Sequence, residues 1–595
     1  MRETTKQIKQ ERNKASVIDS GFVRRWQILI LALTGLFAGS VTASGDFALL
    51  DHKGQFHQLS RYAEQDAAVI LVVSDQDQTS RRALASLQQI RQRLQTDSSA
   101  NDIVYFLLYA EANPDRRLVQ SMVAVQETDV PVLLDDAQIV LATLEAQQLG
   151  DVFVLDPGSQ EVVYRGGLGA PDDSGDSQTD ALTQALTGTL GGSSDVEESA
   201  RATGPDINYV YQQQLRERTV SYQSEIAPIL QRRCAHCHVE EGLAPWAMNR
   251  HLMILGWSPM IREVVMTRRM PPGQIDGYVG DWQQTHELPA QELATLIHWI
   301  DQGAPQDGEV DPLSEAKPET EAWPLGEPDL VVDVPAQSLP ATGIVDFLLE
   351  SADLSLSEDK WLRAVAYDVG DKSVLHSLMI YARNEGAPVM SETDLIDPEV
   401  SDYVSIFVPG ERADEFPANS AYQLQADRDL AFKIRYLTSG RETVDRTRIG
   451  LYFQDEAPDM VVETLEIANK NISIPAGAAE HRETALSEPL ASDMYLSSLS
   501  PHAHGRAKSM QLTAVLPDGE RELIANVANY NFNWQLTYRL QQPLLLPAGT
   551  RLEAVTVYDN SLANPYNADP DVSVQWGVSD QDEMFNHYVR FLRAR

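Results

Sequence analysis

Residues 68–73 read Ala-Val-Ile-Leu-Val-Val, an apolar run typical of a strand buried on both faces. Residues 81–94 follow with one apolar helix face, made by Leu84, Leu87, Ile90 and Leu94. Further strand-like runs lie at 103–109, 152–157 and 162–166. This order of strand, helix and strands predicts an α/β layer fold for residues 44–190.

The rest of the 595-residue chain predicts a multidomain protein. Residues rich in Gly, Ser and Pro mark linkers, which we place at 191–207 and 306–327. The segment between them, 208–305, is mainly helical in pattern. Short alternating strands with turn signals then predict two all-β sandwiches, jelly-roll-like, over 328–462 and 463–595.

The charge balance and the cysteine count exclude several classes of protein. The chain has 87 acidic against 47 basic side chains, a net charge of −40. Phosphate binding needs clustered Lys and Arg, so we expect no nucleic-acid partner. The same charge disfavours docking on anionic lipid. Two cysteines in so long a chain rule out a disulfide scaffold.

The N-terminus predicts export. Residues 1–25 hold seven Lys/Arg against three Asp/Glu, and the apolar run 28–39 follows. Small residues at Val41 and Ala43 complete a secretory signal over 1–43, cleaved after Ala43. The alternative is an uncleaved anchor, although its apolar core is short for a span of about 20 residues. We expect a periplasmic or otherwise exported protein, with membrane contact only through this segment if it stays uncleaved.

Residues 234–238 read Cys-Ala-His-Cys-His, the CxxCH attachment signature of c-type haem. In this motif Cys234 and Cys237 form thioethers and His238 is an axial iron ligand. A zinc knuckle would need further ligands, and a redox dithiol is disfavoured by the helical surroundings. We therefore expect 208–305 to be a small all-α cytochrome c domain that holds one covalent haem c.

The sixth iron ligand is expected downstream of the motif. Met270 precedes two prolines, which can hold a thioether rigidly over the iron, and a Met/His pair suits electron transfer. Met260, Met266 and Met253 are the alternatives. His298 is interpreted as a packed surface residue.

The stretch 500–506, Ser-Pro-His-Ala-His-Gly-Arg, places His502 and His504 on the same face of a strand. Met584 is a soft donor in the final strand region. Two imidazoles and a thioether suit copper, especially Cu(I). These three residues are therefore the candidate copper ligands and the candidate catalytic site.

The α/β segment resembles the peroxiredoxin (redoxin) group of thioredoxin-like domains. The resemblance is carried by the element order and by an FxLLDxxG element at 47–54. That group places its reactive cysteine just after the strand that ends here at Val73, whereas residues 74–80 contain none. Thiol chemistry needs a thiolate, so we expect a structural or docking role.

Residues 328–595 resemble the copper type II, ascorbate-dependent monooxygenases, the group of peptidylglycine and dopamine β-monooxygenases. The matching stretches are 361–365 (WLRAV), 448–453 (RIGLYF), 500–504 (SPHAH), 558–561 (YDNS) with Asn564-Pro565, and 576–577 (WG) leading to 582–584 (DEM). The resemblance implies two β-sandwiches that face each other across a cleft. The oxygen-activating copper then falls on His502, His504 and Met584. The order of all three modules also resembles a bacterial multidomain set.

The resemblance breaks at the second, electron-supplying copper, which that family holds with three histidines. Two of those positions fall on Leu375 and Arg435, and only His376 remains. A guanidinium is not a copper ligand, so we expect one copper ion and a structural role for His376.

These observations leave two hypotheses. In the first, an external donor passes electrons through haem to one copper, where oxygen meets a small-molecule C–H substrate. In the second, the chain is a non-catalytic electron carrier or envelope-assembly subunit with a degenerate monooxygenase region. Oxygen consumption after reduction distinguishes them. A hydrolase is disfavoured because no GxSxG or HExxH motif is present.

Overall fold

The computed structural model describes residues 45–595 except 76, 96–101, 171–173, 189–196, 241–243, 316–321, 344, 346–347, 385–400, 578 and 580. Residues 45–595 form one compact unit. The predicted export signal, 1–43, lies outside the described residues. Within the described ranges, no helix combines the length and the apolar character that crossing a membrane requires.

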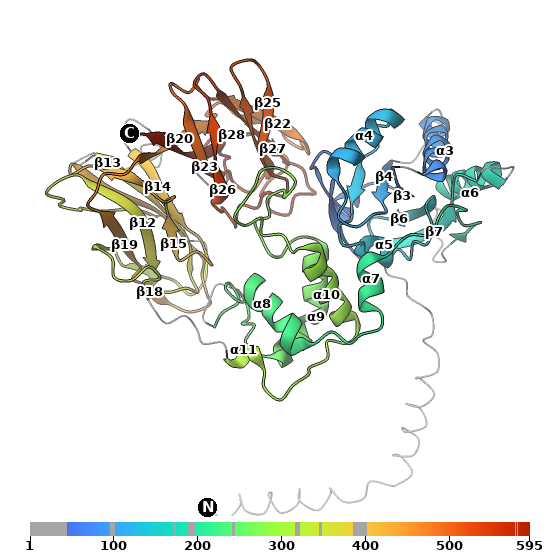
Figure 1. Ribbon diagram of the computed structural model, residues 1–595, viewed down its shortest axis with the longest axis horizontal. Helices are drawn as coiled ribbons and strands as arrows, with labels where there is room; N and C mark the ends of the chain where they lie inside the picture. The colour runs from blue at the N-terminus through green and yellow to red at the C-terminus, as the bar shows by residue number, and fades with distance from the viewer. Residues whose placement is uncertain are drawn as a thin grey trace, which may run out of the picture. The chain divides into compact units, whose positions relative to one another are not determined.

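The N-terminal part, blue to cyan in Figure 1, is an α/β layer structure. Its elements are β1 (Ala48–Asp51), β2 (Phe56–Gln58), η1 (Leu59–Tyr62), β3 (Ala67–Val73), α3 (Gln78–Gln95), β4 (Ile103–Tyr109), α4 (Arg116–Gln126), β5 (Val132–Leu134), α5 (Ile139–Thr143), β6 (Asp151–Asp156), β7 (Glu161–Gly167), α6 (Ser174–Gly188) and β8 (Glu197–Glu198).

Four neighbouring strands, in the order β4-β3-β6-β7, have the arrangement of the thioredoxin fold. β3 and β4 are parallel, whereas β6 runs antiparallel to β3 and to β7. α3 makes the crossover between the parallel pair, which a hairpin cannot join. Apolar side chains of α3 and α6, such as Leu87 and Leu182, cover one face of the sheet. The predicted thioredoxin-like α/β region is confirmed.

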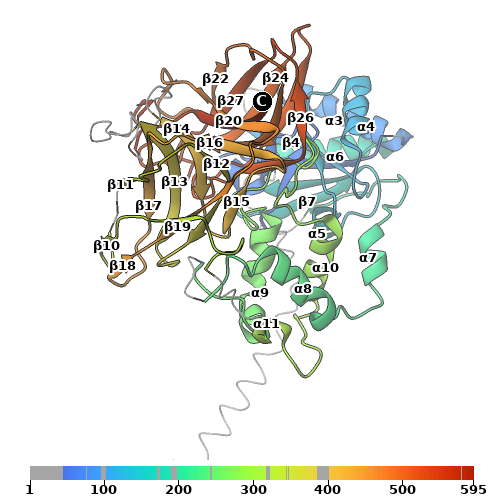
Figure 2. The same cartoon turned by 60° about the vertical axis from the view of Figure 1, so that its left-hand side comes forward.

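The other face of this sheet packs on a group of helices. The elements are α7 (Val210–Leu215), the π-helical turn η3 (Tyr222–Ile226), α8 (Ala227–Arg233), α9 (His251–Met266), α10 (Ala290–Asp301) and α11 (Pro312–Glu315). Three of them, α8, α9 and α10, lie close together in Figures 1 and 2. Ile70 and Val72 of β3 share one buried apolar cluster with Ile254 of α9 and Trp299 of α10. Because the core is shared, the separate small all-α domain expected over 208–305 is not evident.

The C-terminal portion is rich in β-sheet. Its strands are β9 (Leu330–Asp333), β10 (Gln337–Leu339), β11 (Leu348–Ala352), β12 (Lys360–Asp368), β13 (Leu375–Asn384), β14 (Ser401–Phe407), β15 (Ala413–Glu415), β16 (Ser420–Leu424), β17 (Arg428–Tyr436), β18 (Thr443–Asp445), β19 (Arg448–Gln454), β20 (Met460–Ala468), β21 (Ser473–Ile474), β22 (His481–Leu486), β23 (Met494–His502), β24 (Ala507–Val515), β25 (Arg521–Val527), β26 (Tyr538–Leu546), β27 (Arg551–Tyr558), β28 (Val574–Gln575) and β29 (Asn586–Ala594).

Two four-stranded sheets, β11-β17-β13-β14 and β22-β27-β24-β25, accompany one long sheet that follows the path β26-β23-β29-β20-β16-β12-β19-β9. Apolar side chains of β13 and β17 share a core with those of β12 and β19. Those of β24 and β27 share another with β23 and β29. β20 continues the long sheet between its halves, because it pairs with β16 on one side and β29 on the other. The predicted boundary between 462 and 463 lies inside β20.

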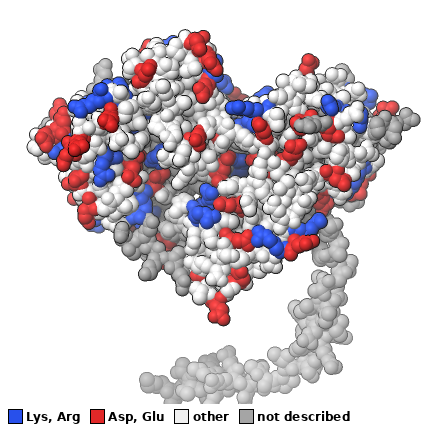
Figure 3. Space-filling view, viewed as in Figure 1, with Lys and Arg blue, Asp and Glu red and all other residues white. Residues whose placement is uncertain are grey.

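On the face shown in Figure 3, Lys and Arg side chains are interspersed among Asp and Glu side chains. The net charge of −40 is therefore not gathered into one acidic patch on that face.

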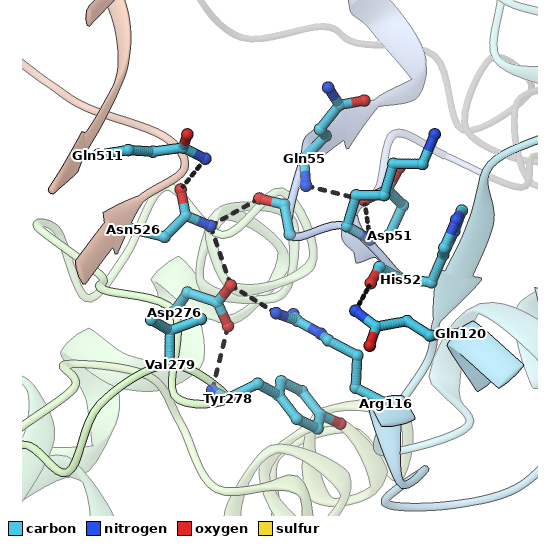
Figure 4. Close-up of polar contacts among 12 residues, drawn as sticks. Asp51, His52, Gln55, Arg116, Gln120, Asp276, Tyr278, Val279, Gln511 and Asn526 are labelled. Atoms are coloured by element: carbon cyan, nitrogen blue, oxygen red, sulfur yellow. Dashed lines mark hydrogen bonds and ion pairs between the residues drawn. The ribbon is translucent and has the colours of Figure 1, made fainter. Parts of the chain in front are cut away.

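One buried charge joins the three parts of the chain, as Figure 4 shows. Nη1 of Arg116, from α4, donates to Oδ2 of Asp276 at 2.7 Å. Nδ2 of Asn526, from β25, donates to the same oxygen at 2.9 Å and to the Gly54 carbonyl at 2.8 Å. The carboxylate and the amide are buried. Asp276 therefore fixes the loop after α9 between the α/β part and the C-terminal portion.

We expect Asp276→Ala to lower the free energy of unfolding by about 3–5 kcal/mol, because the Arg116 charge would stay buried without its carboxylate. Urea denaturation of the full chain measures the change. Asp301→Ala is the control, since its ion pair with Arg262 is about half exposed and should contribute less than about 1 kcal/mol. Equal losses in the two variants would contradict the assignment.

Candidate functional site

The turn after β3, where redoxin domains carry their reactive cysteine, is built from hydroxyls and carboxylates. The Ser74 backbone N–H donates to Oγ of Ser80 at 3.0 Å. The Ser80 N–H donates to Oδ2 of Asp77 at 2.7 Å, which starts α3. The only two cysteines of the chain are Cys234 and Cys237. The turn therefore has the fold of a thiol site without its nucleophile.

The CxxCH segment follows α8 directly. Cys234 and Cys237 are half-buried and not joined by a disulfide. Burial raises the pKa of Cys234 to about 12 and that of Cys237 to about 11. A reactive dithiol needs the opposite shift, because the thiolate is the nucleophile.

His238 is oriented by a backbone contact. Its Nδ1 donates to the Trp246 carbonyl at 3.0 Å, which leaves the Nε2 lone pair available. Cys234 and Trp246 are half-buried and pack against the core that the helices share with the sheet, and the Trp246 ring lies 5.0 Å from that of His238. The oriented imidazole and the two thiols are the groups that covalent haem attachment uses, but none of the three residues lines the cavity that Met270 lines.

The methionines after the motif differ in position. Met270 lies in the loop after α9, and its backbone N–H donates to the Val264 carbonyl at 3.0 Å. Met266 is buried in the core and lines the same cavity of about 70 Å³ as Met270. Met260 is 47% exposed, and Met253 is half-buried. His298 is half-buried and lies 3.0 Å from Nε2 of Gln302.

His502 and His504 end β23 and begin the turn after it, and their ring centroids are 5.8 Å apart. Nδ1 of His502 donates to Oε1 of Gln535 at 2.7 Å, and Nδ1 of His504 donates to the Asp582 carbonyl at 3.1 Å. Both rings are buried. Nε2 of His504 has no hydrogen-bond partner among the described residues. Each ring therefore uses its Nδ1 proton in a hydrogen bond, and Nε2 of His504 keeps an unshared lone pair, the state that a metal ligand requires.

Glu583 ties the two halves of this site together. Its Oε2 accepts from the backbone N–H groups of His504 at 2.8 Å and Met584 at 3.2 Å. Its Oε1 accepts from the Arg506 N–H at 2.6 Å. Tyr558 donates its hydroxyl to the Met584 carbonyl at 2.7 Å. The fully buried Met584 thioether is thereby held on the same backbone frame as His504.

Burial keeps the two imidazoles neutral. It lowers the pKa of His504 to about 3, and the nearby Lys433 cation lowers it further. The pKa of His502 lies well below its usual value for the same two reasons. Neutral nitrogen and thioether sulfur are soft donors, so the set fits copper better than Mg²⁺ or Ca²⁺.

His376 and Arg435 stand at two of the positions where the monooxygenases that the chain resembles hold their second copper, and they lie near each other on β13 and β17. The Arg435 cation and burial lower the pKa of His376 to about 4, with burial the larger cause. Arg435 lies 3.9 Å from the Phe532 ring centroid, and that ring meets His504 edge-on at 5.5 Å. A guanidinium therefore occupies the neighbourhood of His376.

Two further histidines lie in this half of the chain. Nε2 of His481 is 2.8 Å from Oε1 of Glu483. His587 is fully buried in β29, and burial lowers its pKa to about 3. His587 lies opposite Pro501 in the sheet, and neither of its ring nitrogens has a hydrogen-bond partner among the described residues.

Among the described residues, no group of three or more His, Cys, Asp and Glu side chains is arranged to hold a metal ion. The His502–His504–Met584 set has only two such members. A cavity of about 640 Å³ lies nearby and is lined by Tyr530 and Arg506, but His502, His504 and Met584 are not in its lining.

Gln535, Asp582 and Glu583 orient the histidines, and sequence reasoning assigned none of them a role. Asp582 and Glu583 belong to the DEM stretch that resembles the monooxygenases, whereas Gln535 belongs to no recognised motif. Its distance from His502 along the chain hides the contact.

No protein-family model matches the sequence, and no curated protein matches it. Solved structures match about a quarter of the chain. A hypothetical protein from Sinorhizobium meliloti 1021 is 20% identical over 28% of this chain and 93% of its own, with a TM-score of 0.24. A putative thiol:disulfide interchange protein DsbE from Chlorobium tepidum is 15% identical over 25% and 96%, with a TM-score of 0.21. Peroxidoxin BcpB from Mycobacterium tuberculosis is 17% identical over 24% and 92%, with a TM-score of 0.19. The thioredoxin-like assignment rests on the strand order described above.

We expect the α/β part to have no peroxidase or disulfide reductase activity, because its β3–α3 turn has no thiol. A coupled peroxide assay on protein prepared without haem measures this. Peroxide turnover in that preparation would contradict the prediction.

We expect one copper ion per chain. His502→Ala or His504→Ala should abolish its binding, and Met584→Ala should weaken Cu(I) binding, because the thioether is the soft ligand. Metal analysis after gel filtration gives the stoichiometry. His376→Ala is the control and should keep the copper. Two tightly bound copper ions, one lost with His376, would show that a second site exists.

Proposed function

We propose that the chain is an exported haem c- and copper-binding oxidoreductase. In this proposal residues 208–305 act as a cytochrome c module, and residues 328–595 form two jelly-roll-like sandwiches of the copper type II monooxygenase kind. The observation that carries it is the buried pair His502 and His504, whose Nδ1 protons are both engaged so that the Nε2 atoms stay available. Nε2 of the buried His504 has no hydrogen-bond partner among the described residues, and a metal ion bound there would supply one.

The haem half of the proposal rests on the CxxCH segment. Cys234 and Cys237 would hold the macrocycle, and His238 would be its axial ligand, oriented by Trp246. Met270 is the proposed second axial ligand, with Met266 next. A haem held in this way supplies one-electron transfer.

The copper half assigns each residue a separate task. His502, His504 and Met584 would hold the ion, and copper bound there would supply oxygen activation toward a small-molecule C–H substrate. Gln535 and the Asp582 carbonyl keep the tautomers that expose Nε2. Burial keeps the rings unprotonated, so protons do not compete with the metal at neutral pH.

Electron supply distinguishes this chain from the enzymes it resembles. Leu375 and Arg435 replace two ligands of the electron-supplying copper, and a hydroxylation needs two electrons. The haem would take over that supply from an external donor. The alternative, a non-catalytic electron carrier or envelope-assembly protein, is favoured by the same two replacements.

We expect one covalent haem per chain, because the sequence has one CxxCH segment. Its two thioethers should make the haem resist acid-acetone extraction. Cys234→Ala or Cys237→Ala should make the haem extractable or absent. Met270→Ala should change the reduced-minus-oxidised spectrum and lower the potential. Extraction of haem from the unmodified protein would contradict covalent attachment. An unchanged Met270→Ala spectrum would place the ligand elsewhere, with Met266 the next candidate.

Oxygen consumption decides between the two functions. After reduction, the copper-loaded protein should oxidise its haem in air, and the His504→Ala protein should not. Stopped-flow absorbance at the haem bands follows the reaction. Equal haem oxidation in both proteins would favour the electron carrier.

A further inference from the structure

The cavity of about 640 Å³ lies where the three parts of the chain meet. Its lining includes Arg61 of the α/β part, Arg268 of the loop after α9 and Lys508 of the C-terminal portion. None of the candidate copper ligands and none of the CxxCH residues lines it. Its volume is that of a small-molecule site, so the cavity is a separate candidate for ligand binding.

Four of the five basic side chains in this lining already have partners. Arg506 donates to the side-chain oxygen of Asn560 and to the Gln581 carbonyl, both at 2.9 Å. The other three form ion pairs with carboxylates, namely Arg268 with Glu287, Arg269 with Glu263 and Lys508 with Glu480. The fifth basic side chain is Arg61.

Arg61 is a cation without a counter-ion. Its Nη2 donates to Oδ1 of Asn529 at 2.8 Å, and its guanidinium lies 4.6 Å from the centroid of the Phe56 ring. Among the described residues, no carboxylate forms an ion pair with it. Burial by the surrounding residues lowers the pKa of Arg61, although the side chain keeps solvent-accessible surface. This combination is expected of a charged group at the wall of a cavity.

The backbone that carries Arg61 is fixed on both sides. Ser60 donates its backbone N–H to Oδ1 of Asp46 at 3.0 Å and its hydroxyl to Oδ2 at 2.7 Å. Tyr62 donates its hydroxyl to Nδ1 of His57 at 2.6 Å. The turn η1 therefore holds the guanidinium at the cavity before a ligand arrives, which reduces the entropy that binding costs.

The groups around Arg61 favour a ligand with one carboxylate and an apolar body. A guanidinium binds a carboxylate through two parallel N–H···O bonds. Glu64 and Asp559 also line the cavity and have no cationic partner among the described residues. These two carboxylates would repel a dianion such as phosphate more strongly than a monoanion. The ring of Tyr566, which is 54% exposed, adds an apolar surface to the same lining.

We propose that this cavity binds a small monocarboxylate with an aromatic or other apolar body. Arg61 holds the carboxylate through its guanidinium, and the Tyr566 ring packs against the body of the ligand. The site needs neither haem nor copper, so it is independent of the function proposed above. Both residues bind the ligand, and neither takes part in a chemical step.

Isothermal titration calorimetry of the full-length protein with phenylacetate tests the ligand class. Phenylacetamide is the neutral counterpart of this probe, and phenyl phosphate is a dianionic one. Phenylacetate should bind saturably and at least about ten-fold more tightly than either, because it alone offers Arg61 a planar single charge. The absence of saturable phenylacetate binding, or tighter binding of phenyl phosphate, would overturn the proposal.

Substitutions test the two residues by the same titration. Arg61→Gln should weaken phenylacetate binding by about ten-fold or more, and Arg61→Lys should weaken it less, because lysine keeps the charge but lacks the planar fork. Tyr566→Ala should weaken it by about two- to ten-fold. Arg91→Gln is the matched control, since Arg91 belongs to the same part, pairs with Asp129 and does not line the cavity.

The control variant decides the role of Arg61. If Arg61→Gln and Arg91→Gln bind phenylacetate equally well, Arg61 does not hold the carboxylate and the proposal is wrong. Far-ultraviolet circular dichroism shows whether each variant is folded. If Arg61→Gln does not fold, the loss in Arg61→Lys relative to Arg91→Gln gives the same decision.

Discussion

The buried carboxylate of Asp276 is the interaction on which the other contacts depend. It accepts from Arg116 of the α/β part and Asn526 of the C-terminal portion, and its own backbone N–H donates to Asn526. A charge removed from water must keep its partners, so the three parts cannot separate here without a large penalty. The loop between Met270 and Asp276 therefore lies where the parts meet.

Local sequence patterns predicted the α/β part well. The apolar run 68–73 lies within β3, and the helix expected over 81–94 became α3, Gln78–Gln95. Patterns of this kind report which face of an element is buried. They do not report what buries it, and the helices of 208–305 pack on the second face of the same sheet. The helical pattern of 208–305 was therefore interpreted as a small separate domain. Periodicity could not show that these helices share a core with the sheet.

The candidate site divides in the same way. His502 and His504 stand two residues apart, so strand geometry alone places them on one face. Gln535 and the Asp582 carbonyl, which fix the tautomers, are 33 and 78 residues away from their histidines. A single hydrogen bond between distant residues leaves no periodic trace in a sequence. Its recognition needs the folded chain.

β20 has a consequence for how any ligand reaches His502. The strand pairs in parallel with β16 and along its full length with β29. β16 pairs with only Met460 and Val461 at the start of the strand, so a motion that separates the two halves of the long sheet would break these two pairings. Side-chain rotation or loop displacement would admit a ligand to the buried histidines without breaking these pairings. A chain divided between residues 462 and 463 would leave each half with part of a strand and an exposed, adhesive edge.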